Sequence, residues 1–249
     1  MDKPTISVVT ATFNRAHVIG DAMRSVQAQT WPHIEHVIQD GGSTDDTLAV
    51  IEATRTPSTR VISEPDTGIY DAINKGIANT TGDIVGLMHS DDFFAAPDVL
   101  SDVAHAFEDP AVDGVYGDLD YVAADNTDRI IRRWRSGQFA PSKLRQGWMP
   151  PHPTLYLRRR VFDNLGLYDT RFRIAADYDA MLRYLHQGQI KLAYIPKVMV
   201  KMRVGGESNR SLSKILKKSS EDYRAIRGNG VGGIGTLARK NLSKITQFF

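Results

Sequence analysis

Short apolar runs alternate with helix-length segments through the first half of the chain. The runs 6–11 and 84–88 are largely apolar, which is typical of strands that are buried on both faces. Between them, Val18, Ala22 and Val26 recur at helical spacing. We expect strands near 6–11, 34–39, 61–62, 84–88 and 112–116. Helices are expected near 14–29, 44–53, 69–79 and 97–107. Asn14 would cap the first helix, and Ser43 or Thr44 would cap the second.

Strands and helices that alternate through short links build parallel βαβ units. The pattern therefore predicts an α/β fold with a doubly wound, mostly parallel, Rossmann-like sheet. After Gly117 the pattern changes. We expect a hairpin or irregular excursion over 118–135, a strand over 152–157, a helix over 175–186 and one or two strands over 190–202. Two helices joined by the glycine-rich segment 228–235 would form a C-terminal helical extension.

Polar residues gather where the predicted strands end, in the segments 12–15, 40–46, 64–71 and 90–92. Ligands of doubly wound sheets bind outside the carboxyl ends of the strands, so this coincidence predicts a binding site. The chain contains neither the G-x-x-x-x-G-K-[ST] pattern of P-loop ATPases nor the G-x-G-x-x-G pattern of nicotinamide dehydrogenases. Both of those classes are disfavoured.

The adjacent carboxylates Asp91 and Asp92 follow a predicted buried strand, where they would repel each other unless a cation compensates them. Hard oxygen ligands suit Mg²⁺ or Mn²⁺ bridging phosphate oxygens. The alternative is a solvated loop in which Asp92 caps the next helix. The other polar clusters at the same predicted edge favour the cation.

Two further segments carry candidate ligand-binding groups. Asp40 could accept a hydrogen bond from a nucleobase N–H or a ribose hydroxyl, although the following glycines also suit a simple tight turn. Lys75 could reach a diphosphate as a point charge. Asp66 and Asp71 belong to the same polar segment, where either could simply favour a helix N-terminus.

The formal net charge of +2 conceals a strong asymmetry, because residues 1–128 contain 22 Asp/Glu and 6 Lys/Arg, and residues 129–249 contain 7 and 25. Such a split indicates either that the halves handle a cation and an anionic partner, or that they neutralise each other across an internal interface. The 249 residues include no cysteine, which excludes a disulfide scaffold, a Cys-ligated zinc site and a thiol nucleophile.

Several ordered motifs together resemble the family 2 inverting glycosyltransferases with the GT-A fold. They cover about residues 4–206 and comprise TISVVTATFN at 5–14, DGGSTDDT at 40–47, GIYDAINKG at 68–76, SDD at 90–92 and ADYD at 176–179. The 68–76 segment and the sequence His152-Pro153-Thr154 further resemble the bacterial colanic-acid-type surface-polysaccharide branch of that family.

The resemblance implies a role for individual residues. Thr12 and Asp40 would lie against the nucleoside, Asp92 would bind the metal, and Asp91 would lie near the ribose or donor sugar. Asp177 would be the catalytic base, although Ala176 stands where many members carry glutamate, and Asp179 is a substitute candidate. The alternative makes Asp177 a helix residue favoured by the dipole. The segment 202–209 resembles a mobile loop, with Gly205-Gly206 as its hinge and Lys201 or Arg203 as a phosphate contact. His152 would stabilise the leaving diphosphate, reach the metal or contact the acceptor, unless it is structural.

The function implied is a metal-dependent, inverting transfer of a sugar from a UDP- or GDP-linked donor to a saccharide or lipid-linked acceptor in surface-polysaccharide assembly. The alternatives are a sugar nucleotidyltransferase and a degenerate membrane-docked binding subunit. We divide the chain into a nucleotide-sugar-binding half at 1–117, an acceptor-binding and catalytic-base half of the same domain at 118–209, and a basic amphipathic helical tail at 210–249.

The tail suggests a further partner. Residues 201–249 contain 11 Lys/Arg and 3 Asp/Glu, and basic amphipathic helices over 212–249 would suit an anionic membrane surface, the catalytic domain or a second subunit. The acidic first half disfavours nucleic acid as a partner. No apolar run has the length of a membrane span, and the N-terminus lacks a signal-peptide profile. We expect a cytoplasmic protein, peripheral on the inner face of the membrane if the tail binds there.

Overall fold

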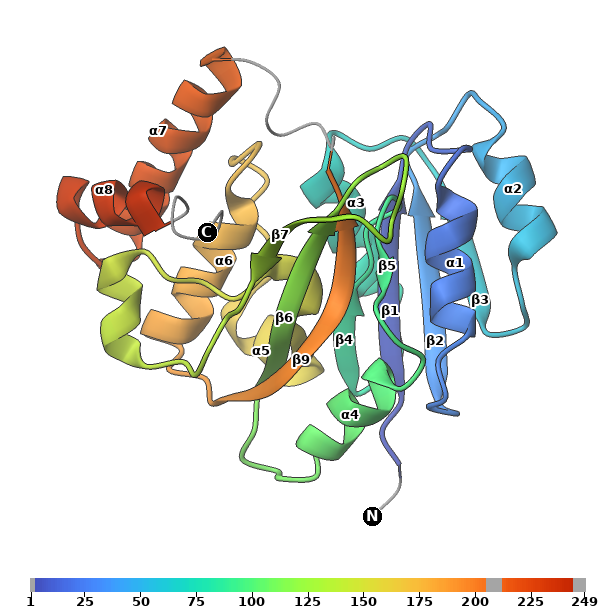
Figure 1. The fold of residues 1–249 in the computed structure, drawn as a ribbon, viewed down its shortest axis with the longest axis horizontal. Helices are drawn as coiled ribbons and strands as arrows, with labels where there is room; N and C mark the ends of the chain where they lie inside the picture. The colour runs from blue at the N-terminus through green and yellow to red at the C-terminus, as the bar shows by residue number, and fades with distance from the viewer. Residues whose placement is uncertain (1–2, 205–211, 244–249) are drawn as a thin grey trace.

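The computed structural model describes the backbone of residues 3–204 and 212–243, and shows an α/β protein built on one nine-stranded sheet (Figure 1). The strand order is β3-β2-β1-β4-β8-β6-β9-β5, and β7 pairs with β6 outside this path. The first half contributes β1 (Ile6–Thr12), α1 (Ile19–Gln27), β2 (Ile34–Asp40), α2 (Thr47–Thr54), β3 (Thr59–Ser63), α3 (Ile69–Ala78), β4 (Ile84–Leu87), β5 (Phe93–Phe94) and α4 (Val99–Ala106).

The second half returns to the same sheet. It contributes β6 (Gly114–Val122), β7 (Ile130–Trp134), β8 (Tyr156–Arg158), α5 (Arg159–Leu165), α6 (Ala176–Leu182), β9 (Leu192–Arg203), α7 (Leu212–Gly228) and α8 (Ile234–Ser243), with 3₁₀ turns at Pro141–Gln146 and His152–Thr154 and a π-helical turn at Arg183–Gln187. β6 runs through the boundary predicted at 117, so both halves belong to one sheet.

The pairing confirms the predicted mostly parallel sheet. β1 pairs in parallel with both β2 and β4, β2 with β3, and β6 with β9, whereas β8 and β5 are antiparallel to their neighbours. Alternate side chains of β1 enter opposite layers of the core, as a strand covered on both faces requires. Ile6 and Val8 pack in the same cluster as helix α4, and Val9 packs with α3.

Three local predictions are wrong. Neither Ser43 nor Thr44 caps α2, which begins at Thr47 and has Asp46 as its N-cap residue without a side-chain cap. Asn14 does not cap α1, which begins at Ile19; Asn14 has a left-handed backbone (φ 52°) and its Oδ1 accepts a hydrogen bond from the Thr44 N–H at 2.8 Å. The predicted strand at 152–157 is a 3₁₀ turn followed by the short β8. That strand lies against β4 because Gly86 has no side chain; a Cβ there would collide with the Tyr156 ring.

Ion pairs between the acidic first half and the basic second half account for part of the charge asymmetry. Eight acidic–basic contacts connect them within the described residues: Asp21–Arg203, Asp98–Lys197, Asp102–Lys197, Asp109–Lys191, Asp113–Arg160, Asp118–Arg135, Asp120–Arg135 and Asp125–Arg129. Most are partly exposed, and each such pair contributes about 0–1 kcal/mol. The interpretation in which the halves neutralise each other is therefore correct for these residues.

The C-terminal helices pack on α6 and its neighbours in the second half of the chain (Figure 1). Asp222 of α7 and Lys240 of α8 form a buried ion pair at 2.7 Å, and the Lys240 ammonium lies 3.1 Å from the centroid of the Tyr178 ring in α6. Within the described part of the chain, no helix is both long enough and apolar enough to cross a bilayer.

A buried histidine in the middle of β2 gives the fold a testable pH dependence. His36 is 1% exposed, its Nε2 lies 3.0 Å from the Thr10 hydroxyl, and burial lowers its pKa to about 4. The unfolded chain takes up this proton near pH 6.5, so stability is fully present above that pH and falls as the pH drops towards 4. The loss amounts to about 3 kcal/mol.

We expect His36→Asn to flatten the decline in urea-unfolding free energy between pH 7 and pH 4.5. The matched control is His33→Asn, because His33 belongs to the same segment and is exposed. An equally steep decline in the His36 variant and the wild type would contradict the assignment.

Candidate active site

The carboxyl ends of β1, β2 and β4 lie side by side, at the edge of the sheet opposite the chain's N-terminus (Figure 1). Thr12 and Asp40 are register partners at the ends of β1 and β2. The segment 88–92 follows β4 at the same edge, since the Met88 N–H donates to the Val9 carbonyl at 2.9 Å. The predicted convergence of these polar segments is thus a consequence of parallel pairing.

Asp40 is fully buried and organises the turn that follows β2. Its Oδ2 accepts hydrogen bonds from the Gly42 N–H at 3.0 Å, the Ser43 N–H at 3.0 Å and the Ser63 hydroxyl at 2.7 Å. The Ser43 hydroxyl donates to Oδ1 at 2.5 Å. The carboxylate therefore holds the glycine turn in shape, and a contact with the nucleoside stays a prediction. Beside it, Thr12 Oγ1 is buried without a hydrogen-bond partner among the described residues.

Asp92 is 1% exposed, and its two oxygens differ. Oδ1 accepts a hydrogen bond from the Arg203 N–H at 3.2 Å, whereas Oδ2 is buried without a partner in the described part of the chain. Burial, and then the neighbouring Asp91 carboxylate, raise the pKa of Asp92 well above its usual value. A buried acceptor left unpaired costs about 1–3 kcal/mol, so this oxygen is suited to a cation or a donor from a ligand.

Arg203 supports this turn from the end of β9. Its guanidinium donates to the Asp91 carbonyl at 2.9 Å, pairs with Asp21 at 2.6 Å and lies 5.0 Å from the centroid of the Phe93 ring. The guanidinium thus contacts protein groups in this structure. Its contact with a phosphate stays a prediction. The predicted hinge Gly205-Gly206 lies outside the described residues.

Asp177 lies in the first turn of α6 and is half-buried. The Tyr70 hydroxyl of α3 lies 3.1 Å from Asp177 Oδ1 and 2.8 Å from the Ile174 carbonyl. Burial, and then the Asp177 carboxylate, raise the pKa of Tyr70 well above its usual value. The Tyr70 hydroxyl therefore stays protonated, and it donates a hydrogen bond that these two acceptors share.

Asp177 and the 91–92 turn share neighbours, which places them at one site. Burial lowers the pKa of His89, and the Asp91 and Asp177 carboxylates both act in the opposite direction. The pKa of Tyr121 is raised by burial and, to a smaller extent, by Asp92 and Asp177. A group whose pKa both carboxylates influence lies near both of them. Asp177 from the second half therefore lies at the same site as the strand-end carboxylates from the first.

His152 forms part of an aromatic cluster next to Asp177. Its Nε2 lies 2.9 Å from the Tyr168 hydroxyl, and its ring centroid lies 5.7 Å from that of His89. Tyr168 in turn stacks on Tyr70 with centroids 5.9 Å apart. Burial lowers the pKa of His152 to about 4, so the imidazole is neutral at pH 7. The hydrogen bond to Tyr168 gives His152 a structural partner, and its contact with a ligand stays a prediction.

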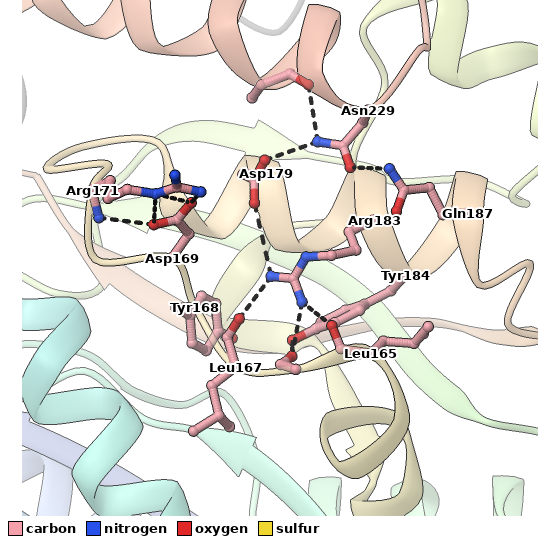
Figure 2. Close-up of polar contacts among 12 residues, drawn as sticks. Leu165, Leu167, Tyr168, Asp169, Arg171, Asp179, Arg183, Tyr184, Gln187 and Asn229 are labelled. Carbon is pink, nitrogen blue, oxygen red and sulfur yellow. Dashed lines mark hydrogen bonds and ion pairs between the residues drawn. The ribbon is translucent and has the colours of Figure 1, made fainter.

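Asp179 lies two residues after Asp177 in α6, and Figure 2 shows its contacts with Asn229 and Arg183. Its Oδ1 accepts a hydrogen bond from Asn229 Nδ2 at 2.8 Å, and its Oδ2 lies 3.8 Å from the Arg183 guanidinium. Burial raises the pKa of Asp179. The side chain thus ties α6 to α7, and its predicted role as a substitute base gains no support from this geometry.

Asp66 and Lys75 hold the loop between β3 and α3. Asp66 Oδ1 accepts from the Gly68 N–H at 2.7 Å, and Lys75 Nζ donates to the Pro65 carbonyl at 2.9 Å. Lys75 Nζ also lies 3.6 Å from Glu64 and 3.5 Å from Asp71. Asp66 packs so closely on Gly41 that a Cβ there would collide with its carboxylate, which joins this loop to the Asp40 turn.

Several residues of the site were missed by sequence reasoning: Tyr70, His89, Tyr121, Tyr168 and Glu221. Tyr70 lies inside the conspicuous 68–76 segment, and His89 directly precedes the 90–92 motif, so position alone could have suggested both. The other three carry no local signal. Their place depends on contacts between segments far apart in the chain.

Asp91 and Asp92 fit a divalent cation whose remaining coordination positions are filled by a substrate. Within the described residues, no group of three or more His, Asp or Glu side chains is arranged to hold a metal ion. Asp92 Oδ2 and the adjacent Asp91 offer oxygen ligands, which leaves further positions to a substrate's phosphate oxygens and water. Mg²⁺ is commonly bound in this way, by one or two carboxylates plus phosphates.

Comparison with known proteins identifies the family. The family model "Glycosyl transferase family 2" matches residues 7–174, which contain the polar strand ends and Tyr70. The chain belongs to glycosyltransferase family 2. It is 34% identical over 185 residues to an uncharacterised glycosyltransferase of Mycobacterium tuberculosis, covering 72% of this chain and 68% of that protein. It is 33% identical over 228 residues to a PGL/p-HBAD biosynthesis glycosyltransferase of Mycobacterium bovis, covering 88% and 84%.

Solved structures confirm the GT-A-type fold of this glycosyltransferase. The S. aureus TarS 1–349 structure in complex with UDP-GlcNAc superposes with a TM-score of 0.70 at 20% identity, covering 91% of this chain and 66% of that one. The mannosyltransferase PcManGT from Pyrobaculum calidifontis, in complex with GDP-Man and Mn²⁺, gives a TM-score of 0.70 at 19% identity, covering 96% and 70%. The chain therefore spans about two thirds of the length of these structures.

Proposed function

We propose that this family 2 glycosyltransferase moves a sugar from a UDP- or GDP-linked donor to a saccharide or lipid-linked acceptor, with inversion and with the help of Mg²⁺ or Mn²⁺. The observation that carries the proposal is the presence, at one site, of two carboxyl groups that differ in burial and in hydrogen bonding. Asp92 is buried with one oxygen unpartnered, and Asp177 is half-buried and receives a hydrogen bond from Tyr70. The pKa values of His89 and Tyr121 are each influenced both by Asp177 and by a carboxylate of the 91–92 turn.

This pair of carboxylates suits an in-line displacement. Asp177 accepts the proton of the acceptor hydroxyl as the acceptor oxygen attacks the anomeric carbon. The bond from that carbon to the diphosphate oxygen breaks, and the nucleoside diphosphate leaves with the electron pair. A divalent cation at Asp92, when bound, would neutralise the charge that develops on the diphosphate. The Tyr70 hydrogen bond fixes the Asp177 carboxylate in position for the proton transfer.

The remaining predicted residues fit around the donor. Thr12 presents a buried hydroxyl without a partner in the described structure, next to the Asp40 turn, at the end where the nucleoside would bind. Asp91 would lie near the ribose or donor sugar. The side chains of Asp66, Lys75 and Arg203 already contact protein groups. They would contact the donor only by giving up some of these contacts, so we propose that they rearrange when the donor binds. His152 would form part of the wall near the leaving group and acceptor.

The names of similar proteins support the donor class and the biological setting. TarS is described with UDP-GlcNAc, PcManGT with GDP-Man and Mn²⁺, and the Mycobacterium bovis relative with PGL/p-HBAD biosynthesis. We propose a role in assembling a cell-surface polysaccharide or a related glycoconjugate. Membership of family 2 disfavours the sugar nucleotidyltransferase. A degenerate binding subunit, suggested by Ala176, is distinguished by the Asp177 experiment below.

We expect Asp92→Asn to abolish the Mn²⁺-dependent gain in affinity for UDP and GDP, measured by calorimetric titration with and without the metal. The amide keeps the size of the side chain but loses the charge that a hard cation requires. Asp46→Asn is the control, because Asp46 is an exposed carboxylate in the neighbouring loop. A retained metal-dependent gain in the Asp92 variant would remove the metal site from this residue.

We expect Asp177→Asn to reduce turnover about 10²–10⁴-fold, the usual contribution of a general base, while UDP or GDP binding is unchanged. The measurement is nucleoside diphosphate release from UDP-GlcNAc or GDP-mannose with Mn²⁺. Asp179→Asn tests the alternative base in parallel. Near-normal turnover in the Asp177 variant would contradict the assignment, and absence of turnover in the wild type with an intact metal-dependent affinity would favour the binding subunit.

We further propose that the outer surface of α7 and α8 contacts an anionic membrane. Leu216, Ile234 and Leu242 are 72%, 73% and 62% exposed. The same described segment carries exposed cations: Lys217, Arg224, Arg227 and Arg239. The acidic residues of described segment 216–242, Glu221 and Asp222, are buried against the rest of the protein. The exposed surface of this segment is therefore apolar and cationic, which suits anionic lipids.

We expect Ile234→Ser combined with Leu242→Ser to reduce flotation with phosphatidylglycerol-containing vesicles about tenfold, because two exposed apolar side chains no longer enter the interface. Ile131→Ser is the control, since Ile131 is an exposed apolar residue on β7. Deletion of the helices is a poorer test, because Glu221 and the Asp222–Lys240 pair hold them against the catalytic half. Equal flotation of all variants would contradict membrane contact through this surface.

A further inference from the structure

Glu221 is a buried carboxylate of α7 that contacts the segment leading into α6. It is 3% exposed, and its Oε2 accepts hydrogen bonds from the Ile174 N–H at 2.8 Å and the Ala175 N–H at 3.1 Å. Ala175 is the N-cap residue of α6 and has no polar side chain with which to cap the helix. The carboxylate that stabilises this helix start therefore comes from a different helix, far along the chain.

The same short segment is held from its other side by Tyr70. The Tyr70 hydroxyl contacts the Ile174 carbonyl at 2.8 Å and the Asp177 carboxylate at 3.1 Å. The Ile174 peptide group is thus bonded through its N–H to α7 and through its carbonyl to α3. Asp177 follows in the first turn of the helix that begins here. A shift of this segment would move Asp177 relative to the 91–92 turn.

We propose that Glu221 is a positioning residue for Asp177, so that α7 is a working part of the active site rather than an appended tail. The inference rests on the proposed role of Asp177 as the base. Glu221 touches neither the substrate sites proposed above nor the reacting atoms; it acts through the backbone of residues 174–175. Because transfer depends on the orientation of the base, a displacement of about 1 Å is enough to lower turnover about 10²-fold.

Two other contacts of the C-terminal segment, one between α7 and α8 and one from Asn229 to α6, provide a matched control. Asp222 pairs with Lys240 at 2.7 Å, and Asn229 donates to Asp179 at 2.8 Å. Asp222 is the neighbour of Glu221, is also buried and also carries a carboxylate, but its partner lies in α8. Asp222→Asn therefore disturbs the packing of the helices without removing the acceptor of the Ile174 and Ala175 amides.

The experiment compares Glu221→Ala, Glu221→Gln and Asp222→Asn in the full chain. We expect Glu221→Ala to lower kcat for nucleoside diphosphate release from UDP-GlcNAc or GDP-mannose by about 10²-fold, with donor KM and UDP or GDP affinity within twofold. Hydrogen exchange at the 174 and 175 amides should accelerate in the same variant. Glu221→Gln keeps an acceptor oxygen and should restore most of both properties. Asp222→Asn should lower the melting temperature but leave both near wild type.

A second arm separates positioning from general stability. In the Asp177→Asn background, Glu221→Ala should change the residual turnover less than twofold, because the group that it positions is already absent. An equal loss in both backgrounds, or an equal loss in Asp222→Asn, would overturn the inference. So would unchanged exchange of the 174 and 175 amides in Glu221→Ala. If Asp177→Asn itself retains turnover, the proposed base is wrong, and the exchange data still report whether Glu221 holds the segment.

Discussion

Parallel pairing of β1 with β2 and β4 is the constraint on which the site depends. It aligns the carboxyl ends of three strands, so that Thr12, Asp40 and the 88–92 segment meet at one edge of the sheet. Beyond the strand ends, the backbone N–H and C=O groups no longer pair within the sheet, and polar side chains can form hydrogen bonds with them. Asp40 holds the amides of its own turn in this way. The same arrangement leaves Thr12 Oγ1 and Asp92 Oδ2 buried without partners in the described structure.

The second half of the chain completes the site by returning to the same sheet. β8 lies against β4, and α6 then presents Asp177 towards the first-half carboxylates. Tyr70 joins the two halves, because its hydroxyl reaches both the backbone before α6 and Asp177 itself. α7 adds a second support to that backbone through Glu221. Asp177, the proposed base, is thus held by helices from three different parts of the chain.

Burial and charge divide the ionisable groups of the molecule into two kinds. Many of the acidic residues of the first half form partly exposed pairs with cations of the second half, and these contribute little to stability individually. The groups in the site are different, because His152 and Asp92 have pKa values moved towards the neutral form by burial. Both neutral groups are compatible with the proposed binding of a diphosphate and a cation at this site.

The sequence by itself determined the fold class, the order of the strands along the chain and the identity of the polar strand ends, because hydrophobic period and turn residues act locally. It also drew attention to Asp92 and Asp177, which lie inside recognisable motifs and whose roles stay predictions. Tertiary structure decided which side chains meet. Asp177 and Asp179 are equivalent in the sequence, but α6 turns one to Tyr70 and the other to Asn229, which directly follows α7. The contacts of Arg203 with Asp21, and of Glu221 with residues 174–175, join positions that no local pattern relates, since their separation is bridged only when the sheet and its helices pack.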